Sequence, residues 1–191
     1  VRLLKYFPKL KTLDAGNCED YSQLMAARAA YPELAIIYNV TLGGEKHPQD
    51  AKTVELSAVT QEEIARLACL TELDTVIAKA GIGENSVALQ NYCRENGLSF
   101  CISVGNAILS EETEEARIEG ASEAELELLS LLPRLTRVHL MEPAAPAEAV
   151  FAFRDKNADM TVTWEKTVSG FLCDMKTEEV DYTDLTVTSI E

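Results

Sequence analysis

Apolar residues recur along the chain in a pattern that returns twice at an almost constant distance. The pattern first has apolar side chains at Phe7, Leu10, Leu13 and Ala15. Leu70, Leu73, Val76 and Ala78 fill the same positions, as do Leu132, Leu135, Val138 and Leu140. The third residue of each pattern follows that of the previous one by 63 and then by 62 residues. We therefore expect three repeated units, at roughly residues 1–63, 64–125 and 126–189.

Two short apolar-x-apolar segments in each unit predict β-strands, because alternate residues of a strand point to opposite faces. These strands are expected to begin near residues 13, 54, 76, 116, 138 and 180, at steps of 41, 22, 40, 22 and 42 residues. One residue of each should point into the core: Leu13, Leu56, Val76, Ile118, Val138 and Tyr182.

The long steps contain a helix, a further strand and a hairpin. Helical patterns lie at 21–32, 86–96 and 148–157, and alternating segments follow at 34–38, 98–102 and 160–164. Turn residues then appear at Gly43-Gly44, Gly105-Asn106 and Ser169-Gly170, where a tight hairpin tolerates positive φ. Thr60 with Glu63, and Ser122 with Glu125, have the spacing of a capping box and predict two helix starts.

The stretch LKTLDAGNC (residues 10–18) resembles the consensus of the leucine-rich repeat family. The 22-residue step also falls within the roughly 20–29 residues of one such repeat. The resemblance is to bacterial two-rung units with one long and one short repeat. It implies an α/β solenoid, or horseshoe, with one parallel concave sheet of about six short strands and with helices and small hairpins on the convex side.

Residues 1–191 would then form a single domain, as a segment of a longer array. The chain starts and stops at the same phase of the repeat, so its ends are expected to contact further repeats or another subunit. An alternative architecture is one doubly wound sheet built from three βαβ-like units.

The same resemblance implies function, because such repeats are commonly parts of secreted or surface-attached proteins and usually bind other macromolecules. We expect a non-enzymatic module that binds a protein or glycan ligand in an extracellular or bacterial cell-surface location. The first alternative is a structural spacer that presents a neighbouring domain. A more remote alternative is a hydrolytic enzyme that uses His139.

Charge and composition exclude several other classes. Seventeen basic and 32 acidic residues give a net charge of −15, which repels phosphate backbones and anionic lipid. We therefore expect no nucleic-acid partner and, without a long apolar run, no membrane insertion. Five cysteines without a C-x-x-C pair and only two histidines do not support a metal site, and no cofactor is expected.

The outward positions of the predicted strands supply the candidate binding surface. Its centre is basic and apolar in an otherwise acidic chain, and consists of Ile77, Lys79, Arg117, Arg137, His139 and Met141. Arginine offers a planar fork that fits carboxylates, so an acidic partner is predicted. The alternative is that these are ordinary solvated strand residues.

His139 invites a catalytic interpretation, because a histidine near a carboxylate can act as a base. Arg117 and Asp181 are its expected neighbours on the concave face. No serine or cysteine is expected at an adjacent position of that face to act as nucleophile. We therefore predict no catalytic residue.

Overall fold

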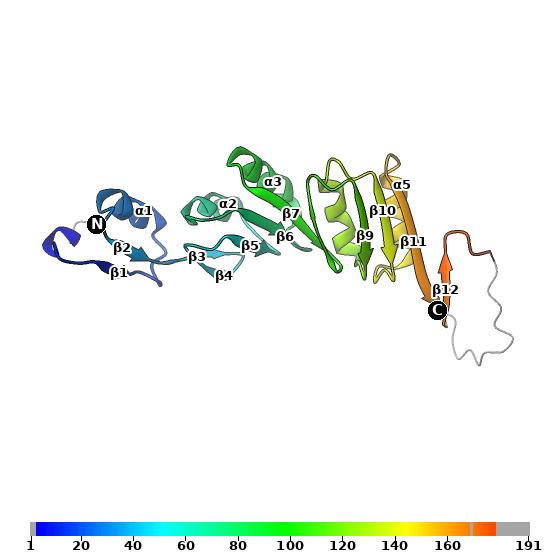
Figure 1. Cartoon of the computed structure of the whole chain (residues 1–191), viewed down its shortest axis with the longest axis horizontal. Helices are drawn as coiled ribbons and strands as arrows, with labels where there is room; N and C mark the ends of the chain where they lie inside the picture. Colours follow the sequence, from blue (N-terminus) through cyan, green and yellow to red (C-terminus); the bar gives the residue numbers. More distant parts are fainter. Residues whose placement is uncertain (1–2, 169, 179–191) are drawn as a thin grey trace. The chain divides into compact units, whose positions relative to one another are not determined.

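The computed structural model describes residues 3–168 and 170–178. It divides into two units, Val1–Phe100 (unit 1) and Cys101–Glu191 (unit 2), which are described separately. Whether the two units belong to the one repeat domain expected from the sequence stays a prediction. Figure 1 labels their helices and strands.

Unit 1 alternates short strands and helices. In chain order it contains β1 (Thr12–Asp14), α1 (Tyr21–Ala30), β2 (Ala35–Ile37), β3 (Asn39–Leu42), β4 (Glu45–Pro48), β5 (Thr53–Leu56), α2 (Gln61–Arg66), β6 (Thr75–Ala78) and α3 (Ser86–Glu95). Short 3₁₀ helices span Leu4–Tyr6, Leu67–Cys69 and Gly83–Asn85. β1 pairs in parallel with β2, and β5 with β6, whereas β3 and β4 form an antiparallel hairpin.

Unit 2 contains one four-stranded sheet of its own. Strand β7 (Ser99–Val104) begins in unit 1, and it is followed by β8 (Ala107–Ser110), β9 (Glu115–Glu119), α4 (Glu123–Leu126), a 3₁₀ helix (Glu127–Leu131), β10 (Arg137–Met141), α5 (Ala147–Lys156), β11 (Thr161–Val168) and β12 (Phe171–Asp174). The sheet order is β12-β11-β10-β9, with β9, β10 and β11 parallel and β12 antiparallel.

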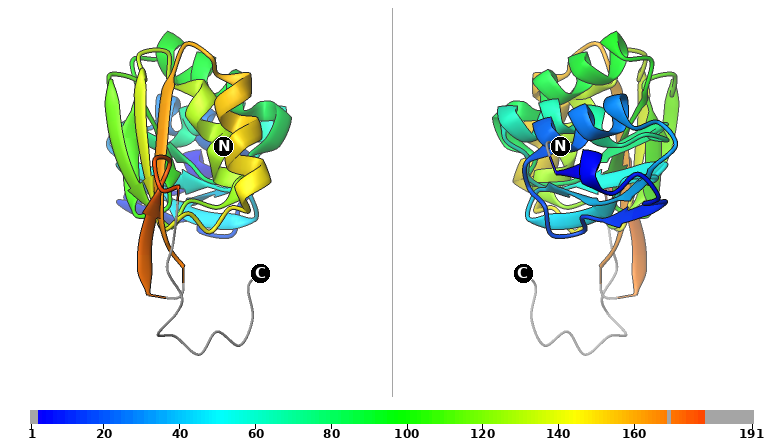
Figure 2. Two further views of the ribbon diagram at one scale, coloured as in Figure 1. Left: turned by 90° about the vertical axis from the view of Figure 1, so that its right-hand side faces the viewer. Right: turned by 90° about the vertical axis from the view of Figure 1, so that its left-hand side faces the viewer.

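Helices α4 and α5 lie on the same face of this sheet, because each follows a strand in the same right-handed sense (Figure 2). Val138, Leu140 and Val162 point toward the helices and are at most 4% exposed. Trp164 packs edge-on against Phe151 of α5, with ring centroids 5.2 Å apart. Among the described residues of unit 2, no helix covers the opposite face of the sheet, the open face.

The predicted local elements are confirmed within the described residues. Helices α1, α3 and α5 match the three helical patterns to within two residues at each end, and strands begin within one residue of the expected positions 13, 54, 76, 116 and 138. Both capping boxes are formed, at Thr60 with Glu63 and at Ser122 with Glu125. The strand expected near residue 180, with Tyr182, lies outside the described residues.

The predicted sheet architecture is wrong. The described strands form four small sheets of two or four strands, namely β1–β2, β3–β4, β5 to β8 and β9 to β12, instead of one parallel sheet of a leucine-rich-repeat solenoid. The alternative of one doubly wound sheet is wrong for the same reason.

The physical cause lies in the long steps. The strand that follows each helix there was expected on a convex side, but β2 pairs in parallel with β1, and β11 with β10. The hairpin strands are not convex additions either, because β12 extends its sheet from β11. The elements therefore form strand–helix–strand units.

Burial follows the predicted alternation in most strands. Leu56, Val76, Ile118 and Val138 are at most 2% exposed. Leu13 is only partly buried, and its strand β1 belongs to a two-stranded sheet.

Candidate functional site

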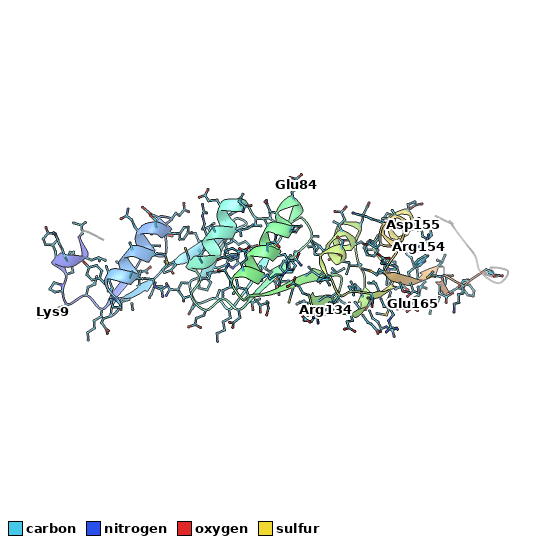
Figure 3. All side chains as sticks on the ribbon, turned by 90° about the horizontal axis from the view of Figure 1, so that it is seen from above. Lys9, Glu84, Arg134, Arg154, Asp155 and Glu165 are labelled. Carbon is cyan, nitrogen blue, oxygen red and sulfur yellow. The ribbon has the colours of Figure 1, made fainter. Side chains whose placement is uncertain are left out.

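The open face of the unit 2 sheet brings together side chains from three adjacent strands. Register places Arg117 of β9, His139 of β10 and Thr163 of β11 side by side. One row earlier lie Glu115, Arg137 and Thr161, and one row later lie Glu119, Met141 and Glu165. Figure 3 shows Glu165 on the strand side of unit 2, away from Arg154 and Asp155 on helix α5.

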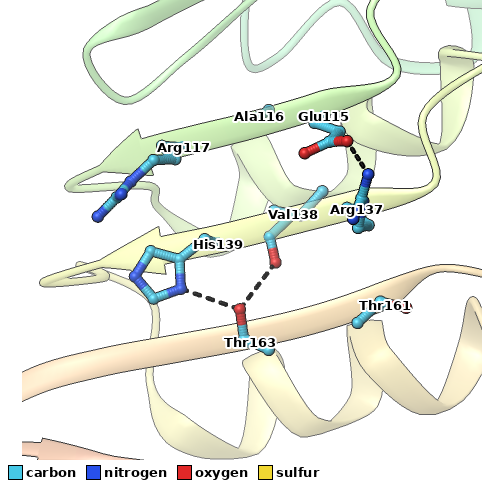
Figure 4. Close-up of a pocket in the computed structure, with 8 residues that line it drawn as sticks. All are labelled: Glu115, Ala116, Arg117, Arg137, Val138, His139, Thr161 and Thr163. Carbon is cyan, nitrogen blue, oxygen red and sulfur yellow. Dashed lines mark hydrogen bonds and ion pairs between the residues drawn. The ribbon is translucent and has the colours of Figure 1, made fainter.

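A hollow of ≈ 490 Å³ lies over this face (Figure 4). Its lining residues come from β9, β10 and β11: Glu115, Ala116, Arg117, Arg137, Val138, His139, Thr161 and Thr163. The hollow is the place where a ligand would contact several strands at once, and the polar groups that converge there decide which ligand fits.

Most charged groups of the face already have partners. Arg137 forms an ion pair with Glu115 on the neighbouring strand. Glu119 accepts a long hydrogen bond of 3.5 Å from the side-chain amide of Asn106. These pairs reduce the charge that the face can offer to a ligand.

His139 is held from two sides. Its Nδ1 lies 2.9 Å from the hydroxyl oxygen of Thr163, and its Nε2 lies 3.5 Å from a carboxylate oxygen of Glu165. The Thr163 hydroxyl also lies 3.4 Å from the carbonyl oxygen of Val138. The imidazole is therefore fixed in orientation, as a binding group or a base requires.

Arg117 differs from the other cations of the face. Among the residues that the structure describes, its one side-chain hydrogen-bond partner is the thioether sulfur of Met141, 3.7 Å from Nη2. A thioether is a weak acceptor, so the guanidinium keeps most of its capacity to bind a carboxylate.

The six residues predicted as a binding surface fall in both units. Arg117, Arg137, His139 and Met141 lie on the open face of unit 2. Lys79 lies just after β6 of unit 1 and pairs with Glu55, and this hydrogen-bonded contact raises the pKa of Lys79. Ile77 was expected to be an exposed flank of the surface, and this is wrong, because it is only 6% exposed.

Two residues of the site, Thr163 and Glu165, were missed in the sequence. Their strand was assigned to a convex insertion, so they were not considered as neighbours of His139. The signal was nevertheless present, because Thr161, Thr163 and Glu165 alternate with Val162 and Trp164. Asp181, which was expected to supply a carboxylate near His139, lies outside the described residues, and Glu165 takes that position.

The described residues show no group of three or more His, Cys, Asp or Glu side chains that could hold a metal ion. Among those same residues, no helix is both long and apolar enough to span a membrane. The extracellular or cell-surface location therefore stays a prediction.

A scan against protein-family models and searches among curated proteins and solved structures find no match for this chain. The resemblance to leucine-rich repeats is not tested by these comparisons.

Proposed function

We propose that the open face of the unit 2 sheet binds a carboxylate-bearing segment of a protein or glycan without catalysing a reaction. Arg117 supports this most directly, because its guanidinium lines the hollow and contacts the thioether of Met141. A planar guanidinium binds a carboxylate through two parallel hydrogen bonds. Met141 supplies apolar surface beside it, and His139 lies next to Arg117 on the adjacent strand.

The acidic residues of the face do not oppose this proposal. Glu115 is paired with Arg137, and Glu165 lies near the His139 ring, so each of these carboxylates contacts a group other than Arg117. A ligand carboxylate would therefore compete with solvent for Arg117, not with a carboxylate already bound to it.

The test is a binding measurement with a fluorescein-labelled hexaglutamate peptide and, in parallel, a labelled hexagalacturonate. We expect Arg117→Ala to weaken binding of the preferred probe by about 1–3 kcal/mol, and Arg117→Lys to restore part of it. Arg134→Ala is the matched control, because Arg134 is an exposed arginine of the same unit that pairs with Glu112 and does not line the hollow.

Equal affinity of Arg117→Ala and the parent chain would contradict the proposal. If neither probe binds the parent chain, the structural-spacer alternative is favoured. Circular dichroism of each variant checks that the fold is retained.

A second candidate function rests on the contacts of His139. A hydroxyl against one imidazole nitrogen and a carboxylate near the other is the arrangement that activates a nucleophile in acyl transfer. Thr163, His139 and Glu165 have these positions. Hydrolysis of p-nitrophenyl acetate that is lost in both His139→Ala and Thr163→Val would favour a hydrolytic enzyme, and equal rates in all three proteins would exclude this use of His139.

A further inference from the structure

A second hollow, in unit 1, is lined by one arginine and by neutral residues. It measures ≈ 500 Å³ and lies beside the C-terminal half of α1. Its lining consists of Met25, Arg28, Ala29, Tyr31, Pro32, Leu34, Ala35, Ile36 and Gln49. A volume of this size falls within the roughly 300–1,000 Å³ of small-molecule sites.

This hollow lies on the side of α1 that faces the later elements of unit 1. Met25 also lines a neighbouring hollow, together with Ala65 of α2 and Cys69 of the 3₁₀ helix that follows α2. Gln49 contributes to the lining from the turn between β4 and β5. The hollow is therefore formed between α1 with β2 and the elements that come after them in the chain.

Two contacts with Tyr38 fix the guanidinium of Arg28. Nη1 of Arg28 donates to the Tyr38 hydroxyl at 2.9 Å, and the guanidinium carbon lies over the phenol ring, 5.9 Å from its centroid. The same hydroxyl donates to the Cys69 carbonyl oxygen at 2.6 Å. Tyr38 is itself buried, so it is a fixed support for the arginine. A guanidinium that is already held in place loses less conformational freedom when it binds a ligand.

These contacts do not neutralise the positive charge of Arg28. Burial raises the pKa of Tyr38, and the hydrogen bond from Arg28 offsets this only in part, so the hydroxyl stays protonated and neutral at pH 7. Among the described residues, no carboxylate forms an ion pair with Arg28. A guanidinium has five N–H donors, and Tyr38 uses one of them, so most remain for an anion.

Gln49 supplies a second donor to the hollow. Its Oε1 accepts a hydrogen bond from the Tyr38 amide at 3.1 Å, which identifies the other end of the side-chain amide as the NH₂ group. An NH₂ group donates hydrogen bonds and does not accept them. Arg28 and Gln49 therefore offer donors, whereas Met25 and Leu34 offer apolar surface.

The corresponding arginine of unit 2 is neutralised by its neighbour in the sequence. Arg154 of α5 stands at the position of Arg28, 126 residues later, and it also lies over an aromatic ring of the strand that follows its helix. Arg154 forms an ion pair with Asp155 at 2.7 Å. Ala29 occupies the position of Asp155 in unit 1, so Arg28 lacks this counter-ion.

We infer that this hollow is a second ligand site, which binds a small organic anion that has a carboxylate and an apolar body. The carboxylate accepts hydrogen bonds from Arg28 and Gln49, and the apolar body lies against Met25 and Leu34. A chain of net charge −15 repels anions at long range, so such a ligand is selected by these local contacts. The inference is independent of the function proposed for the open face of unit 2.

Fluorine NMR of para-fluorophenylbutyrate, titrated with the 191-residue chain, measures this binding. The matched neutral probe is para-fluorophenylbutanol, which has the same ring and the same chain length. We expect the carboxylate probe to bind at least about tenfold more tightly than the alcohol, because only the carboxylate can pair with Arg28. Equal affinities of the two probes would overturn the inference, as would a carboxylate probe that does not bind the parent chain.

Substitutions on α1 assign the binding to this hollow. Arg28→Gln should weaken binding of the carboxylate probe at least about tenfold, because it removes the charge and the planar fork. Ala29→Asp leaves the contacts of Tyr38 in place and adds the counter-ion that Arg154 has in unit 2, so it should weaken binding several-fold. Ala26→Asp is the matched control and should leave binding nearly unchanged, because Ala26 is an exposed residue of the same helix that does not line the hollow.

Arg117→Ala separates this site from the open face of unit 2, whose arginine it removes. The binding that Arg28→Gln loses should persist in Arg117→Ala. Binding that is lost in Arg117→Ala but kept in both Arg28→Gln and Ala29→Asp would overturn the inference and assign the probe to the open face. Circular dichroism of each variant checks that the fold is retained, and Ala29→Asp decides the question if Arg28→Gln does not fold.

Discussion

The carboxylates of Glu63 and Glu125 each accept hydrogen bonds from two separate parts of the chain. Glu63 accepts bonds from the Thr60 amide at 2.8 Å and from the Gly43 amide at 3.0 Å. Glu125 accepts bonds from the Ser122 amide at 2.8 Å and from the Gly105 amide at 3.2 Å. The helix start and the preceding hairpin turn are thus joined, once in each unit.

The glycines of these turns are needed for close approach as well as for backbone conformation. Gly43 has φ of 57°, and a Cβ there would lie 2.5 Å from the Ala58 carbonyl oxygen. Gly44 has φ of 82° but open space around it. We expect Gly43→Ala to lower the free energy of unfolding by more than about 2 kcal/mol and Gly44→Ala by about 1 kcal/mol. Urea unfolding measures both, and equal losses would show that close approach is unimportant.

The capping glutamates make stability depend on acid pH. The hydrogen bond from the Thr60 amide holds the pKa of Glu63 below its ordinary value, because it stabilises the carboxylate. Burial pushes the pKa of Glu125 upward, but the bonds from Ser122 and Gly105 outweigh it and the net shift is downward. Each carboxylate therefore contributes stability that is fully present above an unfolded pKa of about 4.3 and is lost as pH falls through the lower folded pKa.

Glu63→Gln should lower the free energy of unfolding by about 1 kcal/mol at pH 7 and reduce its fall in acid. Glu62→Gln is the control, because Glu62 lies in the same helical turn and forms an exposed ion pair with Arg66. Unfolding curves between about pH 7 and pH 3 compare the variants. If the free energy of unfolding fell by the same amount in acid for Glu63→Gln and for the parent chain, this account would be contradicted.

At the scale of elements, alternate residues of β9 point toward the core and toward the open face of the sheet. Ile118 is fully buried on the face of the sheet that the helices cover, while Arg117, its neighbour in the sequence, is exposed on the open face. Ile118→Asp should cost several kcal/mol, since it buries a charge without a partner. Thr161→Asp, on the open side of the same sheet, should change stability little. Thermal unfolding distinguishes the two, and comparable losses would mean that the assigned faces are wrong.

Local elements were predictable because their signals are local. The Thr60–Glu63 spacing predicts a helix start, and the alternation around Val138 predicts a strand; both are confirmed. Pairing was not predictable in the same way, since alternation states which face a residue occupies but not which strand lies beside it. That is why β11 was misplaced and Thr163 was missed. The burial of Ile77 likewise depends on tertiary neighbours that its own strand does not specify.

For the molecule as a whole, the dominant property is its negative charge. At −15, the chain should repel a DNA duplex even at low salt, where attraction would be least screened. Fluorescence anisotropy of a labelled duplex is expected to stay unchanged on addition of protein. A rise that disappears with added salt would show that the basic residues near the N-terminus act independently of the total charge.

The double role of Glu63 and Glu125 also limits where insertions and deletions can be tolerated. Gly43 and Glu63 are 20 residues apart, and so are Gly105 and Glu125. The repeats themselves differ by one residue, and this difference lies between the first strand and the hairpin, where 30 residues separate Leu13 from Gly43 but 29 separate Val76 from Gly105. An insertion or deletion between the turn glycine and the glutamate would move the carboxylate away from one of its two donors. An insertion or deletion outside this interval would leave both hydrogen bonds in place. The interval from the turn to the helix is thus the part of the repeat that could be exchanged between units as a cassette.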